Sequence, residues 1–319
     1  MAVVTLKTGE TFTCSETTIL DSALSSGIVL EHSCKRGDCD SCECVLLDGK
    51  AQEPSGVRQT GDVIKTCLAK PLADCLLSAE YIAELQSIET VVSPAKVSSI
   101  SRSSDIAVLK LRLPPTVKFH FIEGQYLNLS LLGVKRSYSI ASTSCESQIE
   151  LHVKKVEGGN MSSHIFGEVK ANTLFRIEGP IGSFFVRESD RPLVFLATGT
   201  GFAPVQAMVK RLLKEGVNRP IKIYWGNRYS GDFYSDFLEQ YIDCRSDKVN
   251  YYKILSQERS GRDERYVQEA AANDINDFSE YEVYACGSPK MISSAKQLLI
   301  SKGLRAENFY SDAFVATTN

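Results

Sequence analysis

The sequence predicts a multidomain chain that combines β and α/β folds, and three observations along its length support this prediction. Cysteines crowd mainly into the first 75 of the 319 residues. Short strand patterns separated by turn signals follow, at a density typical of a small antiparallel barrel. Apolar strand patterns then alternate with helical patterns, as in a doubly wound parallel sheet. We therefore expect three domains, over residues 1–88, 89–188 and 189–319.

Composition indicates a globular redox or metal-binding protein. The hydrophobic content of 43% and the charged content of 24% are ordinary. The N-terminus lacks a secretory signal, and no apolar run approaches the roughly 20 residues that span a bilayer. Ten cysteines in a chain without such a signal favour metal or redox chemistry over disulfides. We expect a protein of the reducing cytoplasm, with no membrane or nucleic-acid partner.

The net charge of −3 is unevenly distributed. Residues 1–88 carry 7 basic and 13 acidic side chains, whereas the remainder carries a small basic excess. The acidic segment could dock a basic electron acceptor. An acidic face that serves only solubility is an equally good interpretation.

Four cysteines have the spacing of iron–sulfur ligands. Cys34, Cys39 and Cys42 follow a C-x4-C-x2-C pattern, and Cys67 lies some distance on. This is the spacing of a plant-type [2Fe–2S] site, in which one loop supplies three thiolates and another segment the fourth. The alternatives are a structural zinc site, which usually comes from two separated cysteine pairs, or reduced buried cysteines.

Strand and helix patterns surround this loop. Thr18 with Asp21 resembles a capping box before a short helix that ends at Gly27. Strands are expected at Ala2–Lys7 and Glu10–Cys14, which form a hairpin, and at Glu43–Leu47, Val63–Leu68 with Cys67 inside it, and Asp74–Tyr81.

The first segment resembles the plant-type ferredoxin fold, a β-grasp-like domain. Gly37 in the loop lets the backbone approach the sulfurs. The family usually has glycine where Asp40 stands, but Asp tolerates positive φ better than most residues. The gap before Cys67 is shorter than in the family and suggests a trimmed loop. The remaining cysteines of the segment are not expected to be ligands: Cys14, Cys44 and Cys75.

The second segment is predicted to be an antiparallel barrel preceded by a linker. The Ser-rich stretch Val91–Ser101 is the expected linker flank. Strands are expected at Ile106–Arg112, Gln125–Leu131, Ser137–Ala141, Ile149–Val156 and Leu174–Glu178.

The barrel carries a flavin-binding pattern at Arg136, Ser137, Tyr138 and Ser139. Arg can neutralise a pyrophosphate, Tyr can stack on an isoalloxazine ring, and a Ser hydroxyl can bond near flavin N5. Tyr138 as an ordinary core aromatic is the alternative. A glycine turn then opens a helix whose N–H groups suit a phosphate, through Gly159, Met161 and Ser162.

Together with the string GPIGSF at residues 179–184, these motifs resemble the ferredoxin–NADP reductase superfamily. The resemblance implies that His152 and Val153 contact the flavin phosphates through their backbone. His152 is more easily understood as a structural strand histidine than as a catalytic base.

The third segment opens with a phosphate-binding βα unit. The strand Leu193–Ala197 runs into Thr198-Gly199-Thr200-Gly201-Phe202-Ala203-Pro204, and the helical pattern Val205–Lys214 follows. This GTGxAP form resembles that of the same superfamily. Further strands are expected at Ile221–Trp225, Asn250–Leu255 and Tyr281–Cys286, and helices at Asp232–Ile242, Tyr266–Asn273 and Lys290–Ser301.

Ligands bind at the carboxyl ends of such strands. The resemblance implies that Cys286 lies near nicotinamide C4, with a packed, inert cysteine as the alternative. Trp225 and Arg228 should meet the adenosine side. Acidic Asp232 nearby favours NADH over NADPH, because a 2′-phosphate needs more positive charge. The string that follows Cys286 supplies three further binding residues: Gly287, Pro289 and Met291.

The C-terminal stretch carries an acid two residues before an aromatic, Asp312 and Phe314. In the superfamily the aromatic covers the flavin and the acid assists near N5. The alternative for Phe314 is ordinary packing, since the chain continues to Asn319.

Longer strings identify a branch. GVKRSYSIAS, YWGNRYSGDFYS, YACGSPKMI and FYSDAFVATTN resemble the CDP-6-deoxy-Δ3,4-glucoseen reductases of 3,6-dideoxyhexose synthesis. The resemblance implies an NADH-dependent reductase with FAD and a [2Fe–2S] cluster, whose electrons pass to a pyridoxamine-phosphate dehydrase. Ser139, Cys286 and Asp312 would shape hydride transfer by orientation and charge.

Two other functions remain open. The reductase component of a multicomponent aromatic or alkane oxygenase would carry the same cofactors and serve a different partner. A redox sensor or metal-binding module without enzymatic activity would not need the flavin and nicotinamide motifs.

Overall fold

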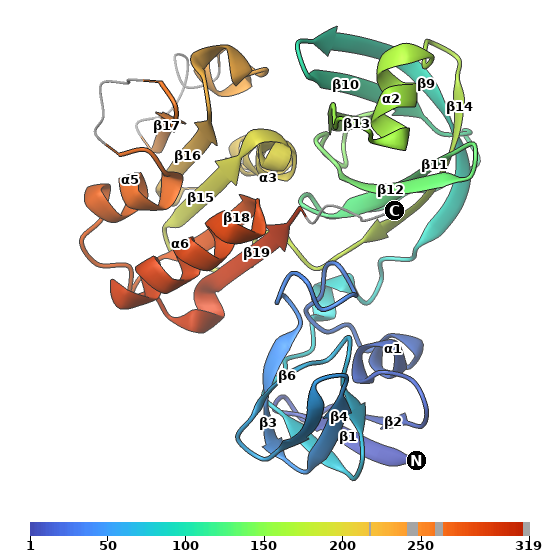
Figure 1. The fold of residues 1–319 in the computed structure, drawn as a ribbon, viewed down its shortest axis with the longest axis vertical. Coiled ribbons are helices and arrows are strands. Elements are labelled where there is room, and N and C mark those ends of the chain that lie inside the picture. Colours follow the sequence, from blue (N-terminus) through green and yellow to red (C-terminus); the bar gives the residue numbers. More distant parts are fainter. Residues whose placement is uncertain (217, 241–247, 259–263, 315–319) are drawn as a thin grey trace. The chain divides into compact units, whose positions relative to one another are not determined.

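The structure, a computed structural model, describes residues 1–216, 218–240, 248–258 and 264–314 (Figure 1). These residues form two compact units. The first unit comprises Met1–Glu89 and Gly182–Phe184, and the second comprises Thr90–Ile181 and Phe185–Phe314. The expected boundary at residue 188 falls inside the second unit and stays a prediction. No helix among the described residues has the length and apolar character needed to cross a membrane.

The first unit is built on a five-stranded sheet in the order β2-β1-β8-β3-β6. The expected hairpin is confirmed, and β1 also pairs in parallel with β8. Thr18 caps α1, its hydroxyl accepting from the Asp21 N–H at 3.2 Å. The elements are β1 (Ala2–Leu6), β2 (Thr11–Cys14), α1 (Ile19–Ser25), β3 (Glu43–Asp48), β6 (Val63–Lys65), β8 (Cys75–Leu77) and the short helix η1 (Ala83–Leu85).

Two details of this unit differ from the sequence-based expectation. The expected strand Val63–Leu68 ends at Lys65, and Cys67 lies in a turn closed by bonds from the Leu68 and Ala69 N–H groups to the Lys65 carbonyl. Strands on both sides of Cys67 in the sequence form a second, three-stranded sheet in the order β5-β4-β7. Its strands are β4 (Lys50–Glu53), β5 (Gly56–Gln59) and β7 (Lys70–Pro71).

The second unit begins with the expected antiparallel barrel. Its six strands run in the order β12-β11-β14-β9-β10-β13, and a bridge between Ile140 and Leu151 joins β12 to β13 and closes the sheet. The elements are β9 (Val91–Ser103), β10 (Ile106–Arg112), β11 (Tyr126–Leu131), β12 (Val134–Ser139), β13 (Ile149–Lys154), α2 (Asn160–Gly167) and β14 (Leu174–Ile181).

The expected linker at Val91–Ser101 was wrong, because these residues form strand β9. Ser93, Ala95 and Val97 alternate into the barrel and are nearly fully buried. Pro94 pairs with β14 only, before β10 joins at Lys96, so its missing N–H removes no bond on the β10 side. The serine and proline content of this stretch is that of a linker. The burial of Ser93, Ala95 and Val97 at every second position is instead the pattern of a strand.

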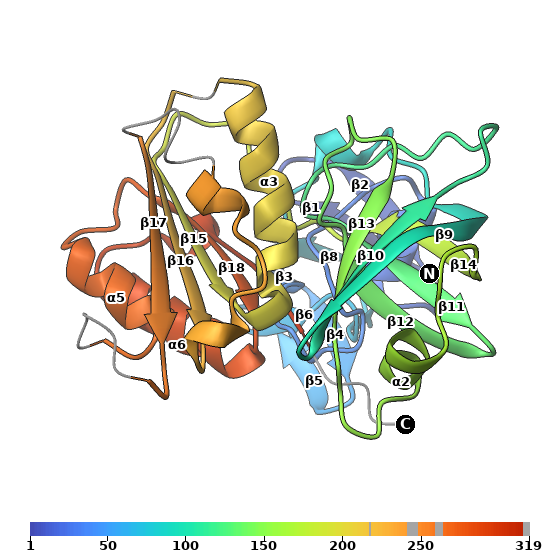
Figure 2. The same cartoon turned by 90° about the horizontal axis from the view of Figure 1, so that it is seen from above.

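The remainder of the second unit is a five-stranded parallel sheet in the order β17-β16-β15-β18-β19. Figure 2 shows α3 on one face of the sheet and α5 and α6 on the other, which confirms the doubly wound arrangement. The elements are β15 (Leu193–Thr198), η2 (Gly199–Gly201), α3 (Phe202–Lys214), β16 (Ile221–Asn227), η3 (Ser230–Asp232), β17 (Val249–Leu255), α5 (Val267–Asp274), β18 (Glu282–Gly287), α6 (Pro289–Ser301), η4 (Ala306–Asn308) and β19 (Phe309–Ala313).

The strand order places a ligand site at β15. The chain passes from β15 through β16 to β17, and then returns to the other side of β15 with β18 and β19. Parallel sheets of this kind bind ligands where the strand order reverses. The glycine loop at Gly199–Gly201 follows β15 at that point.

Two sequence-based expectations in this sheet need correction. The C-terminal stretch forms a strand, β19, that was not foreseen. The expected helix Asp232–Ile242 was placed too early, because Asp232 ends η3 and helical structure begins at Phe237. The Asp232 carboxylate instead accepts the Tyr229 N–H at 3.1 Å. The part of this helix beyond Gln240 lies outside the described residues.

Candidate functional site

The four predicted cluster ligands lie in two pairs. The Cys42 thiol donates to the Cys67 sulfur at 3.2 Å. Cys39 stands beside Cys34, whose N–H donates to the Cys39 sulfur at 3.4 Å. Among the described residues, no three His, Cys, Asp or Glu side chains are grouped around a point that a single metal ion would occupy. Two thiol pairs fit a cluster of two irons better than one tetrahedral zinc.

The electrostatics of the thiols agree with this pairing. A hydrogen bond from Cys39, opposed by burial, lowers the pKa of Cys34 to about 5. A hydrogen bond from Cys42 lowers the pKa of Cys67 in the same way, while the pKa values of the two donors rise. Each pair therefore shares a proton that a metal would displace on binding thiolate.

The loop backbone supplies N–H groups to the sulfurs. The Arg36 N–H donates to the Cys34 sulfur at 3.3 Å. Positive φ angles at Lys35 (55°), Gly37 (82°) and Asp40 (57°) turn the chain around this space. A Cβ on Gly37 would lie 2.4 Å from a Leu68 methyl carbon. The expectation that Asp40 takes the glycine conformation is confirmed.

The other described cysteines of the first unit lie outside the two pairs. All are free thiols, and Cys14, Cys44 and Cys75 are buried. Burial raises the pKa of the Cys44 thiol to about 12. The Cys75 thiol donates to the Ala73 carbonyl at 3.1 Å, so its S–H group has a hydrogen-bond acceptor in the backbone.

Residues 182–184 belong to the first unit, and Ser183 makes hydrogen bonds to its His32. The Ser183 hydroxyl accepts the His32 N–H at 2.8 Å and donates to the His32 carbonyl at 2.9 Å. Burial lowers the pKa of His32 to about 4, so this imidazole is neutral. The sequence offered no signal for this contact, because the two residues are 151 positions apart.

The three predicted catalytic residues come together in the second unit. The Ser139 hydroxyl at the end of β12 lies 3.5 Å from an Asp312 carboxylate oxygen on β19. Asp312 is the register partner of Cys286 on β18. Ser139 and Asp312 are about 5% exposed, and Cys286 is fully buried. Burial and then the Asp312 charge raise the pKa of the Cys286 thiol, so it is neutral and not a nucleophilic thiolate.

The remaining flavin-motif residues lie along β12. Tyr138 is half-buried and packs against the barrel core, and burial raises the pKa of its phenol. Tyr138 therefore contacts the barrel core, as its alternative interpretation as a core aromatic expects, and part of the side chain stays exposed. The Ser137 hydroxyl donates to the Asn128 side chain at 2.7 Å, and an Arg136 guanidinium N–H donates to the Lys135 carbonyl at 2.8 Å.

The expected phosphate turn precedes α2. Gly159 is the N-cap and leaves the first N–H groups of the helix without a side-chain cap. The Ser162 hydroxyl bonds the Val156 N–H and carbonyl, each at 3.1 Å, and fixes the turn. Met161 is buried in the barrel core. The uncapped N–H groups of α2 and the Arg136 guanidinium on β12 have the chemistry that a pyrophosphate site needs.

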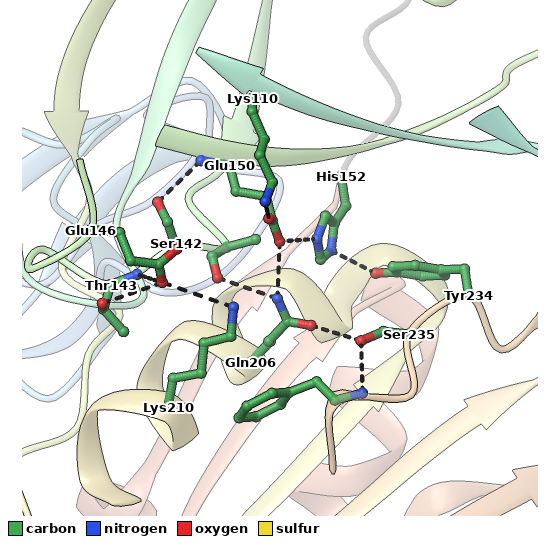
Figure 3. A network of polar contacts seen from close by, with 12 residues as sticks. Lys110, Ser142, Thr143, Glu146, Glu150, His152, Gln206, Lys210, Tyr234 and Ser235 are labelled. Atoms are coloured by element: carbon green, nitrogen blue, oxygen red, sulfur yellow. Dashed lines mark hydrogen bonds and ion pairs between the residues drawn. The ribbon is translucent and has the colours of Figure 1, made fainter. Parts of the chain in front are cut away.

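The His152 side chain lies in a buried polar network that the sequence did not reveal (Figure 3). Its Nε2 lies 3.0 Å from a Glu150 carboxylate oxygen, and its Nδ1 lies 3.0 Å from the Tyr234 hydroxyl. The structural role expected for this imidazole is therefore supported. The predicted contact of His152 and Val153 with flavin phosphates concerns their backbone and stays a prediction.

Gln206 extends the network from α3. Its amide donates to the same Glu150 oxygen at 3.1 Å, and its carbonyl oxygen accepts from the Ser235 hydroxyl at 2.9 Å. Burial raises the pKa of Glu150, but the His152 bond and three nearby cationic or potentially cationic groups lower it to about 2 overall. The available signal was Gln206 itself, a polar side chain inside the apolar face of a helix.

The glycine loop is supported from below by Trp225. The indole N–H donates to the Gly199 carbonyl at 2.9 Å, and the ring stacks on Phe202 with centroids 3.9 Å apart. Trp225 is fully buried, so the side chain predicted to meet the adenosine lies beneath the loop. A Cβ on Gly201 would lie 2.3 Å from the Cys286 carbonyl oxygen. The loop thus needs glycine to reach the end of β18.

The other predicted nicotinamide residues stand at the same edge of the sheet. Gly287 has φ of 144°, and its carbonyl accepts the Phe314 N–H at 2.8 Å. Ser288 caps α6 by accepting the Met291 N–H at 3.3 Å, with Pro289 in the first turn. Thr200 and Pro204 lie in the loop and the first turn of α3, and Arg228 follows β16.

Three family descriptions match the chain in sequence. A "2Fe-2S iron-sulfur cluster binding domain" matches residues 4–72, an "Oxidoreductase FAD-binding domain" matches residues 94–186, and an "Oxidoreductase NAD-binding domain" matches residues 195–297. The predictions of FAD, a [2Fe–2S] cluster and a nicotinamide cofactor are confirmed.

Similar proteins run the full length of the chain. Protein RfbI of Salmonella typhimurium is 48% identical over 94% of this chain and 92% of its own. A CDP-6-deoxy-L-threo-D-glycero-4-hexulose-3-dehydrase reductase of Yersinia pestis is 43% identical over 93% of both. The terephthalate 1,2-dioxygenase reductase component 1 of a Comamonas species is 33% identical over 94% and 92%. The solved structure of the Amycolatopsis cytochrome P450 reductase GcoB has the same fold, with a TM-score of 0.76, 22% identity and coverage of 98% and 99%.

The thiol pairs lead to a prediction about the fourth ligand. Cys67→Ala should abolish the cluster, because one iron would keep a single protein ligand. Cys44→Ala should retain it, because Cys44 lies outside both pairs and is its matched control. Iron and acid-labile sulfide per chain, together with visible absorption, measure the outcome. Loss of the cluster in Cys44→Ala with retention in Cys67→Ala would contradict this ligand set.

The Glu150 network predicts a dependence of stability on pH. Its folded pKa of about 2 is below the reference value of 4.5, so ionised Glu150 stabilises the fold above about pH 4.5 and this contribution is lost as pH falls toward 2. Glu150→Gln should lower the free energy of unfolding by roughly 1–2 kcal/mol at pH 7. The difference from the parent should shrink at pH 3–4.

Urea unfolding of the holoprotein at several pH values measures this effect. Glu178→Gln is the control, because that carboxylate pairs with Lys135 at a solvent-exposed site. Its effect should stay within about 0.5 kcal/mol. A Glu150→Gln difference that is independent of pH would show that Glu150 is not the titrating group.

Proposed function

Because the chain belongs to the family of the CDP-6-deoxy-L-threo-D-glycero-4-hexulose-3-dehydrase reductases, we propose that its electron acceptor is the pyridoxamine-phosphate dehydrase of that pathway. In this proposal the chain is an NADH-dependent oxidoreductase of the cytoplasm. Its electrons complete C-3 deoxygenation of a CDP-4-keto-6-deoxyhexose in 3,6-dideoxysugar synthesis. The observation that carries the proposal is the high identity to a named dehydrase reductase along nearly the whole chain.

The cofactors define what the residues have to do. When bound, FAD supplies acceptance of a hydride and release of single electrons, and the [2Fe–2S] cluster supplies one-electron transfer. The protein must therefore orient a nicotinamide against a flavin, keep water away from that contact, and hold the two irons by thiolates.

The hydride site is proposed at the buried group formed by Ser139, Cys286 and Asp312. The Cys286 thiol is neutral, polarisable and fully buried, so a nicotinamide ring would be oriented against it once the side chains that cover it move aside. The Asp312 carboxylate next to it would favour positive charge that develops on the nicotinamide as hydride leaves. The Ser139 hydroxyl, which lies 3.5 Å from that carboxylate, would hydrogen-bond near flavin N5.

The two binding surfaces follow from the same edge of the sheet and from the barrel. Gly199, Thr200, Gly201 and Pro204 would hold the dinucleotide phosphates, with Gly287, Pro289 and Met291 on the nicotinamide side. Arg136, Ser137, Tyr138 and the turn at Gly159–Ser162 would hold FAD, with Phe314 covering the ring.

A preference for NADH rests on two carboxylates near the end of β16. Asp232 accepts the Tyr229 N–H, and Glu258 accepts the Ser230 N–H at 2.7 Å and its hydroxyl at 3.2 Å. These acids occupy donors that a 2′-phosphate would need and add negative charge near it. Arg228 is the basic residue of the segment 227–236.

The oxygenase-reductase function is the second candidate, favoured by the likeness to a dioxygenase reductase component. It requires the same cofactors and the same hydride site. Only the acceptor protein distinguishes the two functions. A non-enzymatic sensor receives no support, because both large domains match oxidoreductase families.

The buried thiol gives a prediction for the hydride step. Cys286→Ala should slow flavin reduction by NADH about tenfold or more, because it removes the surface that orients the nicotinamide. Stopped-flow absorbance measures this rate, and NADH titration separates it from binding. The exposed Cys145→Ala is the control and should reduce at the parent rate. An unchanged rate in Cys286→Ala would leave this thiol with a packing role only.

The choice of acceptor is tested by reconstitution. The chain, NADH, the purified dehydrase and its CDP-hexulose substrate should yield the 3-deoxygenated sugar, with product measured by chromatography. Dye reduction by NADH is the control that the reductase is active. Failure with the dehydrase, alongside success with a Rieske or diiron hydroxylase, would replace this proposal with the oxygenase function.

A further inference from the structure

Lys65 connects the two segments that supply the cluster ligands. It is the last residue of β6 and stands two positions before Cys67. Its ammonium group donates to the Gly37 carbonyl at 2.7 Å and forms an ion pair with Asp40 at 2.5 Å. Gly37 and Asp40 both lie in the loop that carries the other three thiols. One side chain thus ties the three-ligand loop to the segment of the fourth ligand.

The Lys65 backbone is itself held in place. Its N–H donates to a carboxylate oxygen of Glu53 at 2.7 Å, and the other Glu53 oxygen accepts from Arg58 at 2.9 Å. Glu53 is buried, and the Lys65 side chain is 28% exposed. An ordinary surface ion pair pays for ordering two mobile side chains and contributes little. Asp40 is 55% exposed, but the Lys65 ammonium also bonds the Gly37 carbonyl, so one ordered lysine side chain makes two contacts with the loop.

The ion pair with Lys65 gives a physical reason for aspartate at position 40, where the resembled family usually has glycine. Its φ of 57° lies in the left-handed region, where Asp is tolerated and a β-branched side chain is not. A glycine would take this conformation at lower cost but has no carboxylate. Aspartate at position 40 therefore adopts this backbone conformation at a higher cost than glycine, and it provides an ion pair with Lys65 inside the loop between Cys39 and Cys42.

We propose that Lys65 is a positioning residue for the [2Fe–2S] cluster, and that the Lys65–Asp40 pair sets the reduction potential of the cluster. This inference rests on the proposed function only in requiring the cluster. The reduced cluster carries one more negative charge than the oxidised cluster. A lysine ammonium beside the loop stabilises the reduced form and raises the potential, and the Asp40 carboxylate lowers it.

Removing the Lys65 charge and removing the Asp40 charge should shift the reduction potential of the cluster in opposite directions. Lys65→Met keeps the chain length without the charge and should lower the potential. Asp40→Asn keeps the tolerance for positive φ without the charge and should raise it. Each shift should correspond to about a threefold to tenfold change in the one-electron reduction equilibrium constant. The double variant should lie near the parent, because both charges of the pair are absent.

Redox titration with chemical mediators, followed by the electron paramagnetic resonance signal of the reduced cluster, measures these potentials in the full-length holoprotein. Lys70→Met, an exposed lysine on β7 of the same unit, is the control for a change in net charge alone and should leave the potential unchanged. Iron and sulfide content gives a second readout, since Lys65→Met should also release its cluster faster on dilution into a chelator.

Some outcomes would overturn the inference. Shifts of the same sign in Lys65→Met and Asp40→Asn, or no shift in either, would show that the pair does not set the potential. If Lys65→Met fails to assemble a cluster, Lys65→Arg should restore assembly, and failure of that variant would remove the positioning role. The titration uses no partner protein, so a wrong electron acceptor would leave these shifts intact. A parent protein that holds no cluster would instead contradict the proposed function itself.

Discussion

The contact on which the second unit depends is the buried approach of Ser139 to Asp312. It joins the last residue of barrel strand β12 to the edge strand of the parallel sheet, beside the buried Cys286 thiol. A hydroxyl, a carboxylate and a neutral thiol from three strands can meet only if barrel and sheet are held in one register. The close fit of Gly201 against the Cys286 carbonyl fixes the glycine loop against the same strand end.

That register is supported by the network around Glu150. The carboxylate lies on a barrel strand, and it gathers His152 from the same strand and Gln206 from the helix that follows the glycine loop. Tyr234 then connects His152 to Trp225 through an edge-on ring contact at 5.1 Å, and Trp225 holds the Gly199 carbonyl. A buried carboxylate is costly unless its acceptor positions are filled, so this network favours one arrangement of barrel and sheet.

The first unit solves a different problem, because its loop must present sulfurs and N–H groups around a small volume. Positive φ angles at three residues give the loop its tight turns, and Lys65 ties it to the turn that carries Cys67. The thiols already lie in two pairs that share protons. The fold therefore brings the two thiols of each pair into contact, and thiolate binding to a metal would release the shared protons.

The sequence alone determined the three-part architecture and the motifs, because cysteine spacing, the glycine loop and strand–helix alternation are local features of the chain. It also placed Ser139, Cys286 and Asp312 in one site by resemblance. Only the tertiary structure decided the contacts between distant segments: Glu150 with Gln206, Ser183 with His32, and Lys65 with Asp40. The structure also shows that the Ser-rich stretch expected to be a linker is strand β9. Such contacts depend on side chains that lie far apart in the chain and meet only when the strands are paired, so no local pattern reports them.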